Sequence, residues 1–536
     1  MASSLLDTPP ELIRKIVFLA YAPLGIPSIF QPLMLTCRYT YCILSAPETY
    51  SQLFATHFDV PPLSIADEAT FRQHAKCEMV RRYITLRTLH RRQVDSDNVL
   101  DVLWCTLIMF GCSAVRQKDI KLLLQAGVSE FLISFILSRL YDASGESSGW
   151  PIEDSVNRLA VLLLWVSTSR FMIDGESPAT RRMLMGCLRP LVFAPYRYSI
   201  SAFPEQLYLP ESPAPASRSP RIHRSCGAYG LPGPRLPEAR LFGDKFQKIQ
   251  LPPIAVPATL AYFARQDLDR PVIPDQLPRT RLEANNLGLS GPTREDFEYF
   301  TDYRTHCCCL ESLQFCVAIR DIAPPYLPGV LTGRYHGSCL IPDRSQYERW
   351  KCSASPPSPL EREEVSRRPF YATLQEYVCY EIEEVIPQDA PENGNMNAWL
   401  PSGFKCTETA NGIVAFDTSG TFKTFYQTYD ANCASQRKIV DIIVAGKTEP
   451  RHAAAWGDFH FIGRIRLADG LITLKRVSVQ YLPITGVSNL GDTILRGQLT
   501  STHNFVGRMK PVSTGFEPSI WEAPFSLSKI HSRPLL

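Results

Sequence analysis

The stretch LLDTPPELIRKIVFLAYAPLG at residues 5–25 predicts a helix near the N-terminus, and MLTCRYTYCILSAPETYSQLF follows at residues 34–54. Thr8 precedes Glu11 by three residues, which is the spacing of a helix capping box, and Pro9 suits the first helical position. Apolar residues then recur at helical spacing and form one stripe: Leu12, Ile13, Ile16, Val17 and Leu19. We therefore expect a helix that begins near Pro9 and presents an apolar stripe to a partner surface.

Three short patterns in this stretch are similar to those of an F-box. The F-box pattern Leu-Pro-x-Glu-Leu followed by Ile-Leu corresponds to residues 8–12 and 16–17. The pattern Leu-x-Leu-Val-Cys-Arg-x-Trp corresponds to residues 33–40, with Thr40 at the tryptophan position. The closing pattern Asp-Pro-x-Leu-Trp corresponds to residues 46–50 and keeps an aromatic side chain at its end. The resemblance covers about a tenth of the chain.

The resemblance implies a short helical bundle that binds the Skp-family adaptor of a cullin–RING ubiquitin ligase. The residues expected to carry that binding are Leu12, Ile16, Leu33, Leu35 and Tyr50, with Cys37 and Tyr39 as secondary contacts or bundle core. A few central apolar side chains usually supply most of the energy of an interface. The alternative is an ordinary N-terminal helical hairpin whose stripe packs on its own domain.

Length and composition indicate a globular protein of two or three domains. The chain has 536 residues, of which 45% are hydrophobic. Its 56 basic and 53 acidic residues leave a formal charge of +3, which disfavours nucleic acid and anionic membranes as partners. No apolar run approaches the ~20 residues of a membrane span. The 16 scattered cysteines favour thiols in a reducing compartment, hence a cytoplasmic or nuclear location.

The pattern of residues changes along the chain. Residues 71–196 read as helices joined by short turns, loosely like a HEAT array but without a fixed repeat period. Residues 197–290 are rich in proline and predict linker or loops, with a short docking helix at 257–265, and residues 291–320 predict one helix. Residues 328–530 alternate apolar with polar positions between glycine-containing turns and predict antiparallel strands with long loop insertions.

The predicted fold class is therefore α+β and multidomain, with helices first and an antiparallel meander or barrel at the C-terminus. This second half also resembles the β-rich domain that follows the F-box in some F-box proteins. The residues that carry this likeness are Gly333–Gly337, Ile484–Gly486 and Pro524–Lys529. The resemblance implies that this domain recruits a protein substrate.

One tetrapeptide recurs within the strand-like region. Phe461-Ile462-Gly463-Arg464 is followed 44 residues later by Phe505-Val506-Gly507-Arg508. One interpretation makes Arg464 and Arg508 paired substrate or anion contacts at the mouth of a barrel. In the other interpretation the same local strand structure occurs twice, with glycine at a bend and arginine in solvent.

The sequence predicts no intrinsic catalysis, no metal and no cofactor. The cluster His306-Cys307-Cys308-Cys309, with Cys316, His336 and Cys339, lacks the C-x₂-C spacing of a zinc site. The string Gly145-Glu146-Ser147-Ser148-Gly149 matches G-x-S-x-G but lies in a polar loop between helices, whereas a nucleophile elbow joins a strand to a helix.

The predicted function is that of an F-box substrate adaptor, which binds a Skp-family protein and through it a cullin–RING ligase. Two alternatives remain at this point. One is a ligand-binding or enzymatic β-barrel with an incidental N-terminal hairpin, marked by an interior pocket with convergent polar groups. The other is a helical-repeat scaffold, marked by a continuous concave surface over residues 71–196.

Overall fold

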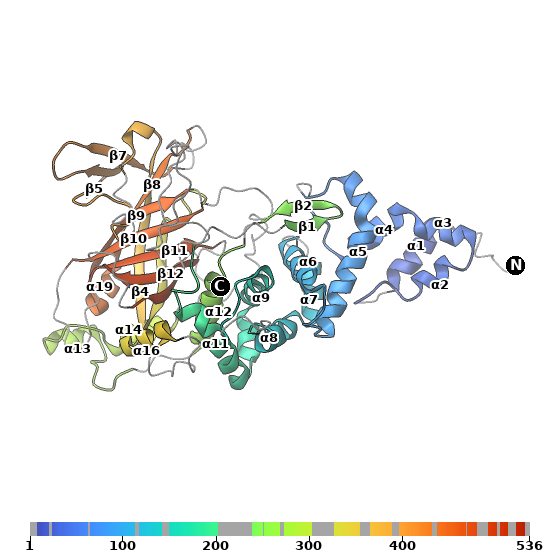
Figure 1. Ribbon diagram of the computed structural model, residues 1–536, viewed down its shortest axis with the longest axis horizontal. Helices are drawn as coiled ribbons and strands as arrows, with labels where there is room; N and C mark the ends of the chain where they lie inside the picture. The colour runs from blue at the N-terminus through green and yellow to red at the C-terminus, as the bar shows by residue number, and fades with distance from the viewer. Residues whose placement is uncertain are drawn as a thin grey trace.

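The protein has helices in its first half and a β-barrel in its second, as Figure 1 shows. The computed structural model describes residues 8–20, 24–62, 65–112, 117–141, 149–201, 238–249, 251–268, 273–302, 326–353, 365–387, 396–430, 437–467, 469–479, 491–500, 504–512 and 521–530. The N-terminal helices lie at one end of an elongated molecule, further helices occupy the middle, and the barrel forms the other end (Figure 1). The α+β class expected from the sequence is confirmed.

Four short helices form an N-terminal bundle: α1 (Pro10–Leu19), α2 (Phe30–Met34), α3 (Arg38–Ser45) and α4 (Pro47–His57). Proline begins α1 and α4, because a proline at the first helical position lacks only an N–H that would have no partner there. The bundle core contains Ile13, Val17, Phe30, Leu44 and Phe54. These residues belong to a larger core that continues through the helical part to the barrel wall.

The capping box predicted at Thr8 and Glu11 is wrong. The N-cap of α1 is Pro9, which has no side-chain oxygen to accept a hydrogen bond, and the helix begins at Pro10. The carbonyl of Thr8 instead accepts a hydrogen bond of 3.0 Å from the Tyr39 hydroxyl. A capping box is present at α3, where the Thr40 hydroxyl pairs with the backbone and side chain of Cys37.

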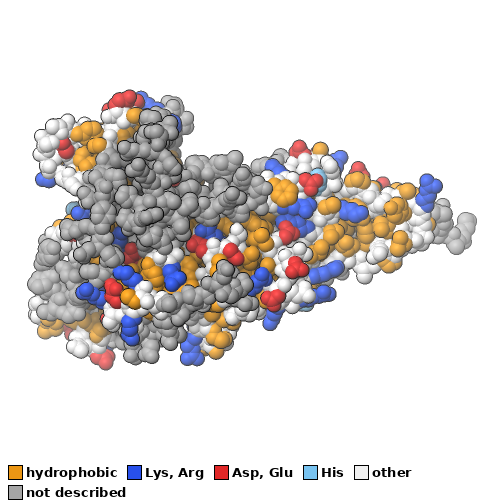
Figure 2. Space-filling view, viewed as in Figure 1, with side chains coloured by type: hydrophobic (Ala, Val, Ile, Leu, Met, Phe, Trp, Pro, Cys, Tyr) orange, Lys and Arg blue, Asp and Glu red, His pale blue; other side chains and the backbone are white. Residues whose placement is uncertain are grey.

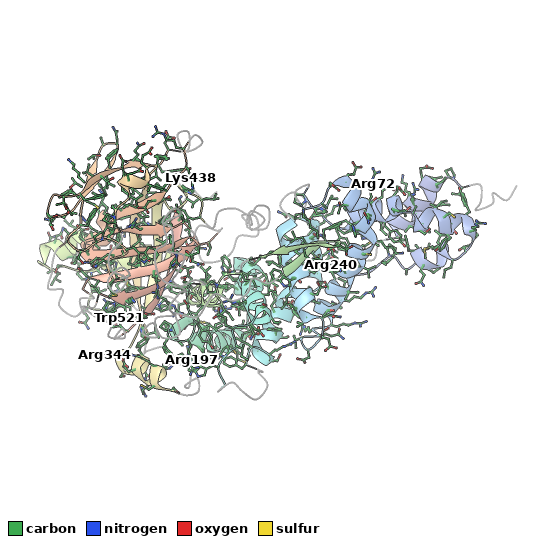
Figure 3. All side chains as sticks on the ribbon, turned by 45° about the horizontal axis from the view of Figure 1, so that its top comes forward. Arg72, Arg197, Arg240, Arg344, Lys438 and Trp521 are labelled. Carbon is green, nitrogen blue, oxygen red and sulfur yellow. The ribbon has the colours of Figure 1, made fainter. Side chains whose placement is uncertain are left out.

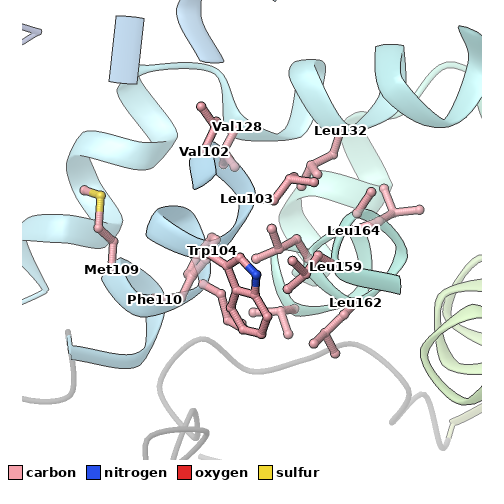
Figure 4. Packing of buried hydrophobic residues seen from close by; sticks show 14 of the residues in the cluster. Val102, Leu103, Trp104, Met109, Phe110, Val128, Leu132, Leu159, Leu162 and Leu164 are labelled. Carbon is pink, nitrogen blue, oxygen red and sulfur yellow. The ribbon is translucent and has the colours of Figure 1, made fainter. Parts of the chain in front are cut away.

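A helical domain follows the bundle. Its helices are α5 (Glu68–His90), α6 (Val99–Cys112), α7 (Lys118–Gln125), α8 (Val128–Ser138), α9 (Ser155–Val166), α10 (Arg170–Gly175) and α11 (Pro178–Phe193). Helix α9 is apolar on nearly every side and is contacted by α6, α8 and α12 (Ala255–Gln266). Figure 4 shows Leu159, Leu162 and Leu164 of α9 packed among side chains of α6 and α8. The domain therefore packs around one central helix.

A buried ionic network fixes the N-terminal bundle to this domain. Arg82 of α5 and Asp119 of α7 form an ion pair of 2.6 Å, and neither side chain is exposed. Asp59, just after α4, joins the network through reciprocal backbone bonds of 3.1 Å: its N–H donates to the Asp119 carboxylate, and the Asp119 N–H donates to the Asp59 carboxylate. Removing one partner of such a pair leaves an uncompensated buried charge, so the network should be important for stability.

Residues 197–290 were predicted as linker and loops with one short helix, and their second half contains more regular structure than that. The structure places a hairpin of β1 (Glu238–Phe242) and β2 (Lys245–Lys248), then α12, then α13 (Arg281–Asn286) in this region. Helix α12 includes the predicted short helix at 257–265 and is buried along its length, because it lies between α9, α11 and the barrel. Residues 202–237 lie outside the described residues.

The helix predicted at 291–320 corresponds in part to α14 (Arg294–Asp302), and residues 303–325 lie outside the described residues.

Eight antiparallel strands close the barrel in the order β3-β13-β12-β11-β10-β9-β8-β4, and the pairing of β4 with β3 completes the circle. Their bounds are β3 (Gly333–Pro342), β4 (Val365–Cys379), β8 (Asp441–Thr448), β9 (Phe459–Arg466), β10 (Leu471–Ser478), β11 (Thr493–Leu499), β12 (Asn504–Pro511) and β13 (Ala523–Ile530). A meander of β5 (Lys405–Thr409), β6 (Gly412–Phe416) and β7 (Lys423–Thr428) is inserted between β4 and β8. Helix α16 (Arg344–Cys352) lies between β3 and β4, and α19 (Pro450–Trp456) between β8 and β9.

Alternate side chains of every barrel strand form one apolar cluster inside the barrel. Its members include Tyr335, Phe370, Val444, Phe461, Leu474, Leu495, Phe505 and Phe525, one from each strand. Gly463 and Gly507 share the inward register, and a Cβ there would come within 1.9 Å and 2.0 Å of a carbonyl oxygen on the neighbouring strand. The repeated tetrapeptide therefore reflects close approach of strands at two places in the barrel wall.

The two ends of the barrel differ in what surrounds them. At the α19 end, β10 and β12 finish at Ser478 and Pro511 while β9 and β11 begin at Phe459 and Thr493. The opposite end carries the β5–β7 meander. Figure 3 labels Trp521, which precedes β13, at the α19 end and Lys438, which precedes β8, at the other.

An ion pair holds α19 to the barrel wall. Glu449, the N-cap of α19, accepts two hydrogen bonds from the Arg334 guanidinium, at 2.9 and 3.0 Å, and lies 2.9 Å from Nε2 of His336. Burial alone would raise the pKa of Glu449, but these hydrogen bonds outweigh burial and lower it to about 2.

Acid should weaken the fold through Glu449. A carboxyl whose pKa falls on folding stabilises the fold above its unfolded pKa, and this contribution is lost as the pH falls through the folded value. The pH window of this loss runs from about 4.5 down to about 2. The contribution of Glu449 to the free energy of unfolding is on the order of 3 kcal/mol at most. Urea unfolding of the wild type and Glu449→Gln across this window checks it. The stability advantage of the wild type should shrink as the pH falls, and a constant difference would contradict the assignment.

Among the described residues, no single helix has the length and apolar character needed to cross a membrane, although α7 and α8, bent by 55°, meet these criteria together.

Candidate functional site

Helix α1 carries two apolar faces, and only one of them is used by the bundle. Ile13 and Val17 point inward and are fully buried. Leu12, Ile16 and Leu19 are 50%, 47% and 73% exposed. Because these three residues are spaced by four and three positions, they share one face of the helix. The apolar stripe expected from the sequence is therefore divided between the bundle core and the surface.

Further large apolar side chains are exposed on the next two helices. Leu35, the C-cap of α2, is 68% exposed, Tyr41 on α3 is 51% exposed, and Ile29, the N-cap of α2, is 40% exposed. Figure 2 shows hydrophobic side chains gathered over the tapering end of the molecule formed by α1–α5. We call the exposed apolar residues of the bundle the N-terminal apolar surface: Leu12, Ile16, Leu19, Ile29, Leu35 and Tyr41.

The predicted docking residues separate into three groups. Leu12, Ile16 and Leu35 belong to the N-terminal apolar surface. Leu33, Cys37 and Tyr39 are half-buried: Leu33 and Tyr39 pack against the core, and Cys37 caps α3. A network of bonds to Thr40 lowers the pKa of the Cys37 thiol, led by the side-chain bond.

Tyr50 is placed differently from the prediction. It is only 5% exposed, its ring lies 5.6 Å from that of Phe30, and the Lys76 ammonium lies 5.0 Å from its ring centre. Its neighbour Thr49 is fully buried and joins three helices, since it donates a 2.6 Å bond to the Ile43 carbonyl and accepts one of 3.1 Å from Arg14. The expectation that Tyr50 contacts a partner is corrected, because α4 turns this side chain into the bundle core.

Tyr50→Ala should therefore act on stability. Truncating a buried aromatic side chain removes its apolar contacts and leaves a cavity, which costs about 3–5 kcal/mol. The midpoint of thermal unfolding should fall clearly, whereas Tyr41→Ala, at an exposed tyrosine of the same bundle, should change it little. Equal midpoints for the two variants would show that Tyr50 is exposed in solution.

The sequence did not single out Leu19, Ile29 and Tyr41 as docking residues. A signal for Leu19 existed, because it lies seven positions after Leu12 and three after Ile16 on a helical wheel. Ile29 and Tyr41 gave no such signal, since their exposure depends on how α2 and α3 pack against α1. Local spacing identifies a helix face but not what covers it.

The two arginines proposed as paired anion contacts do not lie together. Arg464 is fully buried in an ion pair with Asp441, with Nη2 2.7 Å from Oδ2, and Nη1 donates to the Trp399 carbonyl at 3.1 Å. Arg508 is 2% exposed and donates to the carbonyls of Leu191 and Val192 at the C-terminal end of α11. Both point out of the barrel and are covered by other elements, so neither the anion site nor the solvent-exposed alternative describes them.

A cleft of about 640 Å³ lies between helices of the middle domain. Its lining includes Ser129, Met172, Glu176, Ser177 and Arg265. Arg265 and Glu176 form an ion pair with contacts of 2.5 and 3.0 Å, and both side chains are buried. The ligand-binding alternative placed its pocket inside the barrel, whereas this cleft lies outside the barrel.

The described residues contain no group of three or more histidine, cysteine, aspartate or glutamate side chains that is able to hold a metal ion. His336 and Cys339 belong to β3, where His336 pairs with Glu449 and burial raises the pKa of Cys339 to about 11. The remaining members of the cysteine-rich cluster, residues 306–309 and 316, lie outside the described residues. So do residues 145–148 of the G-x-S-x-G string.

Comparisons with protein-family models, curated proteins and solved structures find no significant match for this chain. The functional assignment therefore rests on its own residues and geometry.

Proposed function

We propose that the protein is an F-box-type substrate adaptor, whose N-terminal bundle binds a Skp-family protein and whose barrel domain recruits a protein substrate. Catalysis of ubiquitin transfer then belongs to the ligase partners. The observation that carries the proposal is the second, exposed apolar face of α1. The motif resemblance of residues 5–54 supplies the identity of the partner.

The exposed face of α1 lies outside the core of the described bundle. Ile13 and Val17 already attach α1 to the bundle, so polar residues at 12, 16 and 19 would serve the fold equally well. Burying one large apolar side chain is worth about 1.5–3 kcal/mol. Three such residues on one helix face thus supply enough energy to anchor a protein interface, and a helix face of this kind fits a hydrophobic groove of a partner.

The middle domain supports a fixed geometry between the two ends of the molecule. One apolar core extends from α1 through α12 and includes Leu340, Trp350 and Val506, which come from the barrel half of the chain. Arg508 adds hydrogen bonds from the barrel to α11, and the Arg82–Asp119 network fixes the bundle to α5 and α7. A rigid connection holds a bound substrate at high effective concentration near the ligase.

The two alternatives receive less support. The middle of the described barrel interior is occupied by an apolar cluster, whereas a ligand-binding barrel keeps a pocket there. The helical domain packs around α9, whereas a repeat scaffold stacks helix pairs that contact only their neighbours.

A direct test uses purified components. The full chain is mixed with a purified Skp-family adaptor and analysed by size-exclusion chromatography, and co-elution in a 1:1 complex is expected. The full chain is preferable to a form lacking the bundle, because Phe54 contacts Phe71 and Phe242 and its removal would expose the core of the middle domain. Separate elution at concentrations in the micromolar range would contradict the proposal.

A further inference from the structure

A charged side chain is buried inside the barrel at the α19 end. Arg476 lies on β10 in the same register as Ile472 and Leu474, whose side chains belong to the interior cluster. It is 6% exposed, and its guanidinium carbon lies 3.4 Å from the ring centre of Phe459 and 5.5 Å from that of Phe370. Arg476 is thus held between aromatic rings just inside the end of the barrel.

This guanidinium has no ion pair with any described residue. Its Nε atom is buried without a hydrogen-bond partner, and the contact made by Nη1 is with the Met509 sulfur at 3.7 Å. A thioether is a weak acceptor, and a cation–π contact recovers only a small part of the cost of taking a charge out of water. Burial lowers the pKa of Arg476 to about 10, which leaves the group charged at neutral pH.

Three other arginines buried in this half of the chain have oxygen atoms as hydrogen-bond partners. Arg464 pairs with Asp441, Arg466 with Asp469, and Arg508 donates to two helix carbonyls. Arg476 differs from all three, because its guanidinium contacts two phenylalanine rings and a methionine sulfur. In contrast to these three arginines, Arg476 has no oxygen atom as a hydrogen-bond partner among the described residues.

A second unsatisfied polar group lies directly opposite. Thr493 on β11 is the cross-strand partner of Arg476, is fully buried, and its hydroxyl has no hydrogen-bond partner. Arg368, in the same register as the inward-facing Phe370, is partly buried close by, paired in the sheet with Cys339. The Asp492 carboxylate is close enough to act on the Arg476 charge, but it already accepts a bond of 3.2 Å from the Ser478 N–H. The local net charge is therefore positive, and the Thr493 hydroxyl lies opposite the arginine as a further hydrogen-bond donor.

We propose that the α19 end of the barrel binds an oxyanion, a carboxylate or a phosphate group, on Arg476 and the Thr493 hydroxyl, with Phe370 and Phe459 as apolar walls. Guanidinium pairs with such groups through two parallel N–H donors, and a hydroxyl adds a third. Arg476 lies two residues before the end of β10, and Phe459 and Thr493 are the first residues of β9 and β11, so these three side chains lie at the same end of the barrel. This site is separate from the N-terminal apolar surface and holds whether or not that surface binds a Skp-family protein.

The test measures the thermal midpoint of the full chain with sodium phosphate or sodium benzoate, each against sodium chloride at matched ionic strength. An anion that binds only the folded state raises the midpoint, by about 2–5 °C at concentrations well above its Kd. The two probes distinguish a phosphate-bearing ligand from a carboxylate with an apolar body. Arg476→Met keeps the apolar volume and should abolish the rise, while Arg476→Lys should reduce the affinity about tenfold.

Arg437→Met is the matched control. Arg437 also lies over an aromatic ring, 5.9 Å from the centre of Tyr380, but it is exposed. Its variant should keep the full response to the anion. Without added anion, Arg476→Met should be at least as stable as the wild type, because it removes an uncompensated buried charge. The proposal is overturned if neither probe raises the midpoint of the wild type, if the rise persists in Arg476→Met, or if that variant loses stability without anion.

Discussion

Replacing Leu12 and Ile16 together with aspartate is expected to abolish co-purification of a Skp-family adaptor while leaving the fold intact. Both side chains are about half exposed on the same face of α1, so the bundle does not need them. A partner groove that accepts apolar side chains would instead have to desolvate two carboxylates. With about 2 kcal/mol for each anchor residue, the affinity should fall by roughly 10³-fold.

Two controls make this result specific. Leu282→Asp places the same charge at a 71% exposed leucine of α13, outside the N-terminal apolar surface, and should leave co-purification unchanged. Circular dichroism and thermal unfolding of the double variant should match the wild type, because neither substituted residue is in the core. Retention of the adaptor by the Leu12→Asp, Ile16→Asp protein would remove the basis of the proposed function.

The outline of this fold is readable from the sequence because periodicity reports burial locally. Alternation in residues 328–530 predicted antiparallel strands, and both the eight barrel strands and the β5–β7 meander follow that pattern. The apolar run of α9 is typical of a buried helix, and α9 is buried along most of its length. Closure of the barrel was harder to predict from the sequence, because the pairing of β13 with β3 joins residues nearly 200 positions apart. This pairing depends on strand tilt and twist rather than on local pattern.

The errors share a physical cause, namely that a side chain's partner is set by tertiary packing. Thr8 has the right spacing for a cap, yet its carbonyl is engaged by Tyr39 from another helix. Tyr50 occupies an aromatic position of the F-box pattern but is turned into the core by α4. Arg464 and Arg508 look like solvent or ligand residues because arginine is rarely buried, and only the structure reveals the acceptors that cover them.

The candidate sites divide in the same way. Leu12 and Ile16 were predictable because a helix face can be read from spacing alone, although their exposure could not. Arg476 gave no sequence signal, since an arginine near the end of a strand is ordinary. Its significance comes from the absence of an oxygen partner, which depends on Phe370, Phe459 and Met509 from three other strands.

The second large effect is expected at the buried pair of Arg464 and Asp441. The Asp441 carboxylate accepts from Arg464 at 2.7 Å and from the Tyr426 hydroxyl at 2.6 Å, and Tyr426 in turn accepts from the backbone N–H of Ile386. This chain of bonds ties β8 and β9 to β7 and to the segment that follows β4. Arg464→Ala would leave the carboxylate charged, buried and short of its main donor, which costs about 3–5 kcal/mol.

The matched control for this loss is the exposed pair of Arg72 and Glu68 on α5, where both side chains are more than half exposed. Arg72→Ala should cost less than about 1 kcal/mol, because solvent already screens the charges. Urea unfolding, followed by tryptophan fluorescence because Trp399 contacts Arg464 through its carbonyl, should therefore separate the two variants clearly. If Arg464→Ala instead kept the stability of the wild type and lost only substrate binding, Arg464 would be a ligand contact and the structural role assigned to it would be wrong.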